Sequence, residues 1–307
     1  MHIGIPDLVS NSYFPAIAAV ELGFMRDEGL DIELELLFPV TDAAHALRDG
    51  RLDFVGGAAH APLVAFPEWK GAKLVAALSQ NMYWFLVVRA DLDVKYGDLA
   101  ALHDISIGAA PGVDVGLREL FVQSCVDIAS SNIQIAPVPG TDSASVSFGV
   151  TAAEALAAGR IDAFWANGMG TKVAVQNGVG KVIVDARRDG APGSTFTFPA
   201  LMTTDALIQR KPETVAGAVR AVVHAQLALR QNPELAIEIG KRLFPPMEAT
   251  LIAPIIERDL PFYDATISES AVVGLNDFAH RVGLLNTEVG YDQVVARQFA
   301  PLWEDQR

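Results

Sequence analysis

The chain has 307 residues, of which 51% are hydrophobic and 20% are charged. This composition supports a sizeable packed core and excludes a disordered or collagen-like chain, and the length allows two domains of ordinary size. The formal net charge of −14 disfavours a nucleic-acid-binding role, because no basic patch in the sequence offsets it. The single cysteine, Cys125, excludes an intrachain disulfide and a thiolate metal cluster, and its apolar helical surroundings predict a buried, inert thiol.

Strand and helix patterns alternate over the N-terminal third of the chain. The segments HIGIP, DIELELLF, LDFVGG and KLVAALS are typical of strands. Helical patterns separate them over residues 13–28, 42–48 and 60–66, the first ended by Gly29. Short strands joined by helices indicate right-handed crossovers and a mostly parallel sheet that is covered on both faces.

The same rhythm begins again after MYWFLVVR, an uninterrupted apolar strand at residues 82–89. The predicted strands are DISIGAA, NIQIAPV, RIDAFWA and KVIVD, and the predicted helices cover 113–128, 152–158 and 169–176. ARRDGAPGST is predicted to be a loop, and TFTFPALMTT at 195–204 a second long apolar strand. The remainder is predicted to be helical. One long helix begins at Pro212, a second is capped by Asn232-Pro233, and further helices are expected around 247–259, 268–282 and 290–304.

Two segments of the chain echo each other, GRLDFVGG at 50–57 and GRIDAFWA at 159–166. Each follows an alanine-rich helical pattern, so glycine is expected to end the helix and Leu or Ile to begin a buried strand. The motif alone is equally compatible with common helix-end chemistry. The two copies, however, stand at matching positions in two successive series of alternating strands and helices. This favours the interpretation that they form equivalent strands of two separate sheets. Trp165 stands where the first echo has Gly56, which predicts bulk in one lobe and space in the other.

Four segments, in chain order, resemble a known family. They are IGIPDLVSNSYFPAIAAVELGFMRDEGLDIEL, AAHALRDGRLDFVGGAAHAPLVA, DISIGAAPGVDVGLRELF and AAEALAAGRIDAFWANG. They resemble the type II periplasmic-binding-protein fold, in the SsuA/THI5-like (NMT1/THI5) family of nitrate-, sulfonate-, taurine- and thiamine-precursor-binding proteins. The resemblance implies an α/β protein with two lobes, each a mostly parallel sheet flanked by helices, and a helical C-terminal tail.

The resemblance also implies that the two lobes are discontinuous in sequence. Lobe 1 would comprise residues 1–86 and 200–307, and lobe 2 residues 87–199. The strands near 82–89 and 195–204 would be hinge crossings, and a ligand cleft would lie between the lobes.

Ligands of open α/β sheets bind at the carboxyl ends of the strands, which gives a short list of candidate residues. Asn11, Ser12 and Tyr13 follow the first strand, and capping of the next helix is the alternative role for the two polar side chains. Ala59 and His60 follow LDFVGG. A neutral His60 at a helix start would bind a ligand as donor or acceptor, and the alternative is a purely structural histidine.

The second lobe contributes aromatic side chains and two helix starts. Trp84 is predicted to form a flat wall on the opposite strand face from Tyr83 and Phe85, with core packing as the alternative for at least one face. Trp165 ends the second echo, and Asn167 follows it either as a ligand residue or as a helix cap.

Gly112 and Val113 are candidate ligand residues after the strand DISIGAA. Sulfonate and nitrate binders of this kind place a hydroxyl at such a helix start, and here the position holds Val113 and Asp114. The neighbouring Asp114 would repel an anion, and none of the candidate loops contains Arg or Lys. We therefore expect an aromatic, amide-rich and nearly neutral pocket.

These features predict a solute-binding protein that captures a small aromatic, amide or weakly acidic molecule for an ABC importer. The expected partners are this ligand and the permease. We expect a monomer without metal, cofactor or nucleic acid.

The alternative is a cytoplasmic enzyme on the same fold, decarboxylase-, desulfinase- or thiamine-pyrimidine-synthesis-like, acting on a small aromatic or heteroaromatic substrate. Its catalytic candidates are His60 and Ser12 as a base and a nucleophile. Ser12 stands where the desulfinase-like enzymes have a nucleophilic cysteine, and the sequence places no acid to orient His60.

The two hypotheses differ in cellular location. No apolar run is long enough to cross a bilayer, and Met1 is followed at once by the strand-like HIGIP rather than by a signal peptide. The sequence therefore predicts either a cytoplasmic protein or a periplasmic, exported one whose leader has been removed.

Overall fold

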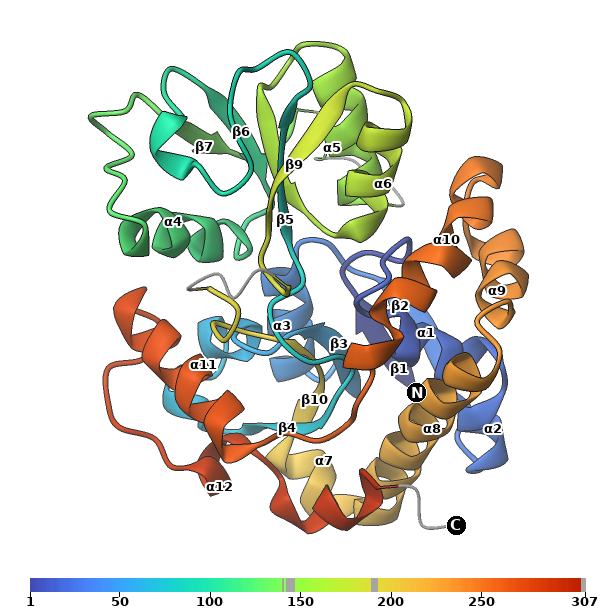
Figure 1. Ribbon diagram of the computed structural model, residues 1–307. Helices are drawn as coiled ribbons and strands as arrows, with labels where there is room; N and C mark the ends of the chain where they lie inside the picture. The colour runs from blue at the N-terminus through green and yellow to red at the C-terminus, as the bar shows by residue number, and fades with distance from the viewer. Residues whose placement is uncertain (140, 142–146, 189–192, 305–307) are drawn as a thin grey trace. The chain divides into compact units, whose positions relative to one another are not determined.

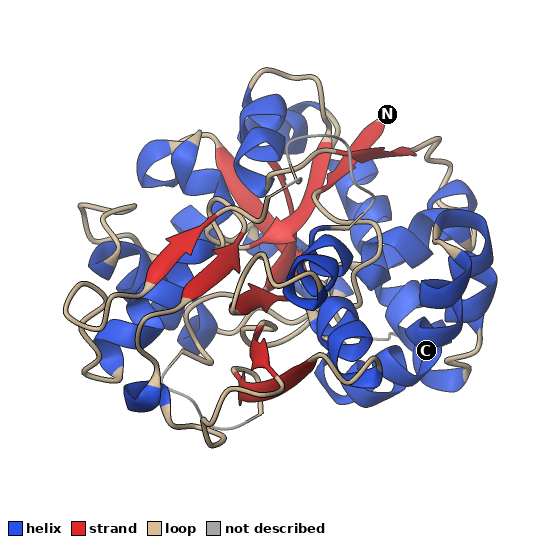
Figure 2. Ribbon diagram, turned by 90° about the horizontal axis from the view of Figure 1, so that it is seen from above, coloured by secondary structure: helices blue, strands red, loops and turns tan. Residues whose placement is uncertain are grey.

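A computed structural model describes residues 1–139, 141, 147–188 and 193–304. The chain divides into two units, Met1–Asn81 with Thr195–Arg307, and Met82–Ser194, which Figure 1 shows with their elements labelled. Each unit has its own five-stranded sheet with helices packed around it, as the second view also shows (Figure 2). The predicted α/β class with two sheets is thus confirmed.

The first unit contains the sheet with strand order β2-β1-β3-β10-β4. Four strands run in one direction, β1 (His2–Ile5), β2 (Glu33–Leu36), β3 (Phe54–Ala58) and β4 (Ala72–Ala77), and β10 (Pro199–Thr204) runs against them. Its helices are α1 (Phe14–Glu21), α2 (Phe24–Asp27), α3 (Val40–Arg48), α7 (Asp205–Arg210), α8 (Pro212–Gln231), α9 (Leu235–Leu243), α10 (Pro246–Asp259), α11 (Glu269–Arg281) and α12 (Tyr291–Val294).

The second unit repeats this topology with strand order β7-β6-β8-β5-β9. Here β6 (Ser106–Ala109), β7 (Gln134–Ala136), β8 (Ala163–Ala166) and β9 (Gly180–Asp185) share one direction, and β5 (Phe85–Arg89) runs against them. Its helices are α4 (Asp114–Gln123), α5 (Phe148–Ala157) and α6 (Gly168–Gln176). In each sheet the antiparallel strand is the first strand after the chain has crossed over from the other unit: β5 in the second unit and β10 in the first.

The two sequence echoes occupy equivalent places in these sheets, since they form β3 and β8. Gly50 and Gly159 end the preceding helices with φ of 72° and 65°, a left-handed conformation that favours glycine. The amide of Arg51 donates to Ala46 O at 3.0 Å, and the amide of Arg160 donates to Ala155 O at 2.9 Å. The backbone therefore turns from helix to strand in the same way twice.

The aspartate of each echo fastens its strand to the neighbouring one. Asp53 Oδ2 accepts the His2 amide at 2.9 Å, and Asp162 Oδ2 accepts the Ser106 amide at 2.9 Å. These amides begin β1 and β6, which pair with β3 and β8. The shared letters of the echoes thus specify one helix end and one strand pairing, which confirms that the echo is part of the scaffold.

Two predicted helices end earlier than the sequence pattern suggested. The segment 13–28 forms α1 and α2 rather than one helix, because Gly23 between them adopts φ of 88°. Helix α4 ends at Gln123, and Cys125 beyond it has φ of 57° and is exposed. The prediction of a buried Cys125 within a helix was therefore wrong.

The two long apolar strands are shorter than predicted. β5 begins only at Phe85, so Tyr83 and Trp84 precede the strand, and their ring centroids lie 4.8 Å apart. The prediction that they point to opposite faces was wrong, because strand alternation does not apply outside the sheet. β10 begins only at Pro199.

The helix predicted around 290–304 is not one continuous helix. After α12, Val295 pairs with Leu74 of the outer strand β4, and η5 (Arg297–Leu302) follows. The Ala296 amide donates to Leu74 O at 3.0 Å, and Trp303 Nε1 donates to Val75 O at 2.8 Å. The tail therefore satisfies backbone groups that an uncovered sheet edge would expose.

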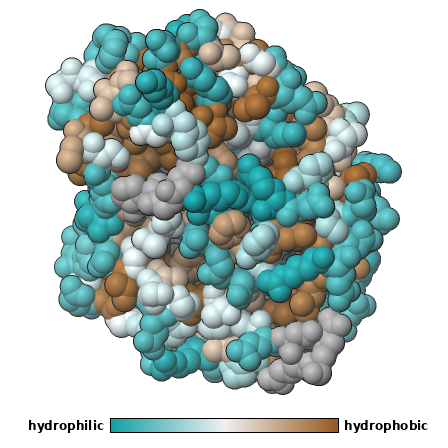
Figure 3. All heavy atoms as spheres, in the orientation of Figure 1, coloured by the Kyte–Doolittle hydropathy of each residue, from teal (hydrophilic) through white to brown (hydrophobic). Residues whose placement is uncertain are grey.

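In the described part of the chain, no helix combines the length and apolar character that a membrane span requires. The face of the molecule in Figure 3 carries mainly hydrophilic residues with hydrophobic ones between them.

Candidate functional site

In the first unit, β1, β3 and β4 end at the same edge of the sheet at which the antiparallel β10 begins. Loops at such an edge form the binding sites of open α/β sheets. The five residues that the sequence predicts for this unit all lie there and are buried: Asn11, Ser12, Tyr13, Ala59 and His60.

Asn11 is held by a segment more than two hundred positions further along the chain. Its Nδ2 donates to Asp259 Oδ2 at the end of α10, and its carbonyl oxygen accepts the Tyr263 hydroxyl at 2.5 Å. Among the described residues, Asn11 Oδ1 has no hydrogen-bond partner, although the side chain is fully buried. A buried acceptor without a partner requires an explanation, such as a bound molecule.

Ser12 does not take the capping role that was its alternative. The N-cap residue of α1 is Tyr13, and no side chain caps that helix. The Ser12 amide donates to Ser10 Oγ at 3.3 Å, whereas the Ser12 hydroxyl is buried and has no partner in the part of the chain that the structure describes. Two adjacent residues thus present unpartnered polar atoms at the carboxyl end of β1.

His60 is oriented by the segment that precedes β10. Its Nδ1 lies 3.0 Å from Thr197 Oγ1, and its ring meets the Phe278 ring edge-on at 5.4 Å. Phe278 in turn stacks on Phe196 at 4.9 Å. His60 stands before the short η1 (Ala61–Val64) without capping it through its side chain.

The space predicted beside Gly56 is occupied by protein. A Cβ atom at Gly56 would lie 2.7 Å from Ile5 Cδ1, so the glycine makes room for the Ile5 side chain rather than for a ligand. Ala59 lies at the same edge, where its amide donates to Phe198 O at 2.8 Å.

The second unit has an equivalent edge, at which β6, β8 and β9 end and β5 begins. Trp84 and Trp165 lie at this edge and are buried, with ring centroids 5.9 Å apart. A Cβ atom at Gly116 of α4 would lie 3.0 Å from Trp84 Cζ3, so the helix packs closely on this ring. Trp165 Nε1 has no hydrogen-bond partner among the described residues.

Gly112 and Val113 form the turn that leads into α4. Gly112 has φ of 80°, and its amide donates to Asp114 Oδ1 at 3.1 Å. Arg118 Nε donates to Asp114 Oδ2 at 3.0 Å, so the negative charge of Asp114 is balanced within its own helix.

Asn167 takes the capping role that was one of its two interpretations. Its Oδ1 accepts the amides of Met169 and Gly170 at 3.0 and 3.3 Å, at the first turn of α6. This contact fixes the start of the helix directly after β8.

The sequence analysis overlooked Arg187, which follows the carboxyl end of β9 and is 5% exposed. Its amide donates to Asp185 Oδ1 at 3.2 Å, while Arg188 pairs with Asp185 Oδ2 at 3.1 Å. The loop after β9 therefore also lies at this edge of the second sheet, and it brings the guanidinium group of Arg187 there. The position of Arg187 just after the predicted strand KVIVD is the sequence signal that points to it, because ligands of open α/β sheets bind at strand carboxyl ends.

Three positioning residues, Asp259, Tyr263 and Thr197, were also missed, and no sequence signal could have found them. Asp259 and Tyr263 stand 248 and 252 positions from Asn11, and Thr197 stands 137 positions from His60. Only the folded chain brings these partners to the edge.

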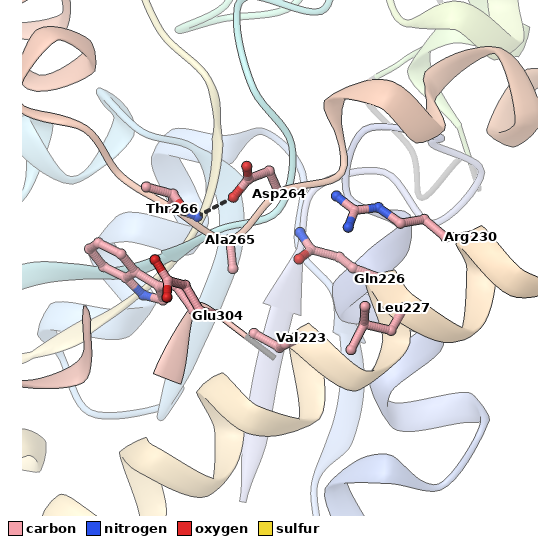
Figure 4. Close-up of a pocket in the computed structure, with 9 residues that line it drawn as sticks. Val223, Gln226, Leu227, Arg230, Asp264, Ala265, Thr266 and Glu304 are labelled. Atoms are coloured by element: carbon pink, nitrogen blue, oxygen red, sulfur yellow. Dashed lines mark hydrogen bonds between the residues drawn. The ribbon is translucent and has the colours of Figure 1, made fainter. Parts of the chain in front are cut away.

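A cavity of about 330 Å³ opens elsewhere in the first unit, between α8, residues 264–266 and residues 303–304 (Figure 4). None of the predicted site residues lines it. Gln226 donates to Ala77 O and Leu78 O at 3.1 and 3.0 Å, and Arg230 donates to Tyr263 O. Gln226 thus holds the end of β4 and Arg230 holds the segment that carries Tyr263, which indicates a structural role.

Solved structures of other proteins share this architecture over nearly their whole length. A protein from Bordetella bronchiseptica RB50 is 19% identical with a TM-score of 0.77, over 98% of this chain and 95% of that chain. The alkanesulfonate-binding protein SsuA from Xanthomonas axonopodis pv. citri, bound to MOPS, is 14% identical with a TM-score of 0.71, over 97% of this chain and 96% of that chain. The chain has the type II periplasmic-binding-protein fold.

Residues 138–236 of this periplasmic-binding-protein fold match the family model described as NMT1/THI5 like, which confirms the resemblance inferred from the sequence. The desulfurization enzyme DSZB also has this fold, with 18% identity and a TM-score of 0.67 over 98% of this chain and 97% of that chain. No curated protein matches the sequence.

Proposed function

We propose that this protein is a solute-binding protein that captures a small organic molecule for an ABC importer. Its working location is then periplasmic or otherwise exported, and its macromolecular partner is the permease. The ligand is aromatic, amide-like or weakly acidic.

The observation that carries this proposal is a pair of buried polar atoms at the carboxyl end of β1, Asn11 Oδ1 and Ser12 Oγ, for which the described residues provide no hydrogen-bond partner. A protein would lose free energy by burying such groups without partners, at a cost of about 1–3 kcal/mol for each. A ligand that hydrogen-bonds to them removes this cost. The place of these atoms, at the carboxyl ends of parallel strands, is the usual ligand position in this type of sheet.

The aromatic residues support the proposed chemical class of the ligand. Phe196 and Phe278 are stacked beside His60 in the first unit, and Trp84 packs on Trp165 in the second. The rings beside His60 offer flat, apolar contact area, and His60 and Ser12 add a few polar contacts to it.

The enzyme hypothesis draws on the fold that the chain shares with the desulfurization enzyme. A nucleophile–base pair of Ser12 and His60 would require a hydrogen bond between the two side chains. Within the described residues the Ser12 hydroxyl has no hydrogen bond, and His60 Nδ1 faces Thr197. This arrangement favours ligand binding over catalysis.

Ligand binding can be measured by a thermal-shift screen of aromatic acids, sulfonates, amides and pyrimidines, followed by calorimetry on the hits. We expect at least one hit, and we expect His60→Ala to weaken its binding about tenfold or more. The matched control is His103→Ala, an exposed histidine that pairs with Asp104 and should leave the affinity unchanged. Unchanged affinity in His60→Ala would show that His60 does not contact the ligand. Chemical conversion of a hit by the wild-type protein would favour the enzyme hypothesis instead.

A further inference from the structure

The inference concerns the chemistry of the bound group, and it rests on the proposed ligand-binding function. We propose that Asp259 sets the orientation of the Asn11 amide, so that the site presents Asn11 Oδ1 as an acceptor beside the Ser12 hydroxyl. The group bound there carries an N–H donor next to an acceptor, as an amide does. A fully ionised oxyanion is disfavoured at this position.

The orientation of the Asn11 amide follows from the chemistry of its partner. An ionised carboxylate has only acceptors, so the amide must turn its nitrogen toward Asp259 Oδ2, as the structure shows. The reverse orientation would bring two oxygen atoms together. Arg258 Nε lies 3.5 Å from Asp259 Oδ1, which supports the negative charge of a carboxylate that is 1% exposed.

The backbone of Asn11 is fixed as well. The Tyr263 hydroxyl donates to Asn11 O at 2.5 Å, and Tyr263 is itself fully buried. Tyr263 thus holds the main chain of Asn11, and the Asp259 carboxylate keeps the amide from turning to suit a different ligand. Its free oxygen is therefore a fixed acceptor.

Asn11 Oδ1 and Ser12 Oγ, which have no partner in the described part of the chain, together define what the ligand must offer. Asn11 Oδ1 can only accept, whereas the Ser12 hydroxyl can both donate and accept. A ligand N–H satisfies the first atom, and a neighbouring ligand oxygen or nitrogen accepts from the second. An anion without a proton would leave Asn11 Oδ1 facing negative charge, and such unmatched polar groups are the strongest means of rejecting a ligand.

Three aromatic probes of similar size separate these possibilities: benzamide, benzoate and benzenesulfonate. We expect benzamide to bind at least about tenfold more tightly than either anion in titration calorimetry at neutral pH. Equal affinities, or tighter binding of an anion, would show that the Asn11 amide does not select the ligand.

The variant Asp259→Asn tests the role of the carboxylate. A second amide at this position can accept or donate, so Asn11 is free to turn and present its nitrogen. We expect the ratio of benzamide to benzoate affinity to fall about tenfold. The control Tyr263→Phe in the same segment removes the hydrogen bond to the Asn11 carbonyl and keeps the Asp259 carboxylate that faces the amide, so the affinity ratio should stay that of the wild type.

If Asp259→Asn does not fold, Asn11→Ala provides the second test, since it removes the acceptor while retaining the Asp259 carboxylate. Benzamide should then lose its advantage over benzoate. An unchanged preference in Asn11→Ala would mean that ordered water alone occupies this place, and it would overturn the inference. Binding of none of the three probes at millimolar concentration would also overturn it, whereas the proposed function fails only if the broad screen yields no ligand.

Discussion

At the scale of single residues, the polar side chains of the candidate site depend on partners that are remote in the sequence. Asn11 is held by Asp259, and His60 lies 3.0 Å from Thr197. Buried polar groups need hydrogen-bond partners, and the folded chain supplies them from the end of α10 and from the segment before β10, without regard to sequence distance. The position of Asn11 and His60 could be predicted from strand ends, but the residues that orient them could not.

The contact between His60 and Thr197 leads to a prediction about stability. Thr197→Val retains the shape of the side chain but leaves the buried His60 Nδ1 facing a methyl group. We expect the free energy of unfolding to fall by about 1–3 kcal/mol, measured by urea denaturation.

Thr171→Val is the matched control for this substitution. The Thr171 hydroxyl donates to Asn167 O at 3.0 Å, and this carbonyl also accepts the Thr171 amide, so the carbonyl keeps a hydrogen bond in the variant. Its cost should be below about 1 kcal/mol. An equal loss of unfolding free energy in both variants would mean that the contact between Thr197 and His60 contributes no more to stability than an ordinary hydrogen bond.

At the scale of elements, the shared part of the two echoes produces the same helix end and strand start. The sequence predicted these elements well, because glycine at a helix end and an apolar residue at a strand start act locally. It failed where a tertiary contact overrides the pattern. The aromatic run before β5 is outside the sheet, and the tail after α12 pairs with β4 instead of continuing as a helix.

The two helix-ending glycines should respond alike to substitution. Gly50→Ala and Gly159→Ala place a side chain at φ of 72° and 65°, and no atom lies within 4 Å of the new Cβ. The cost is therefore backbone strain alone, about 1 kcal/mol in each case, measured by chemical denaturation.

Gly290→Ala serves as the control for these two variants. Gly290 also has open space around a new Cβ, but its φ is −76°, which alanine adopts without strain. This variant should be as stable as the wild type or slightly more stable. A loss at Gly290 as large as at Gly50 would contradict the explanation through backbone conformation.

At the scale of the whole molecule, the chain forms one sheet topology twice. The second unit is continuous in sequence from Met82 to Ser194, whereas the first is assembled from two segments. Each sheet receives its antiparallel strand shortly after the chain enters the unit, β5 in the second and β10 in the first. The second unit therefore contains all the strands of its own sheet.

The isolated segment 82–194 is accordingly expected to fold without the rest of the chain. Its sheet is complete, and Phe121, Phe164 and Trp165 are among its fully buried side chains. Circular dichroism and a cooperative urea transition would establish folding. A random-coil spectrum of the segment, with a normal transition of the full chain, would show that the second unit depends on the first.

The sequence by itself determined the α/β class, the repeated helix-to-strand unit and the loops that contain the candidate site residues. These features follow from hydrophobic periodicity and from the local chemistry of glycine, proline and capping residues. Tertiary structure decided that β10 joins the first sheet, that the tail covers β4, and that Asp259 orients Asn11. These outcomes depend on satisfying buried backbone and side-chain hydrogen bonds between segments far apart in the chain, which local patterns do not encode.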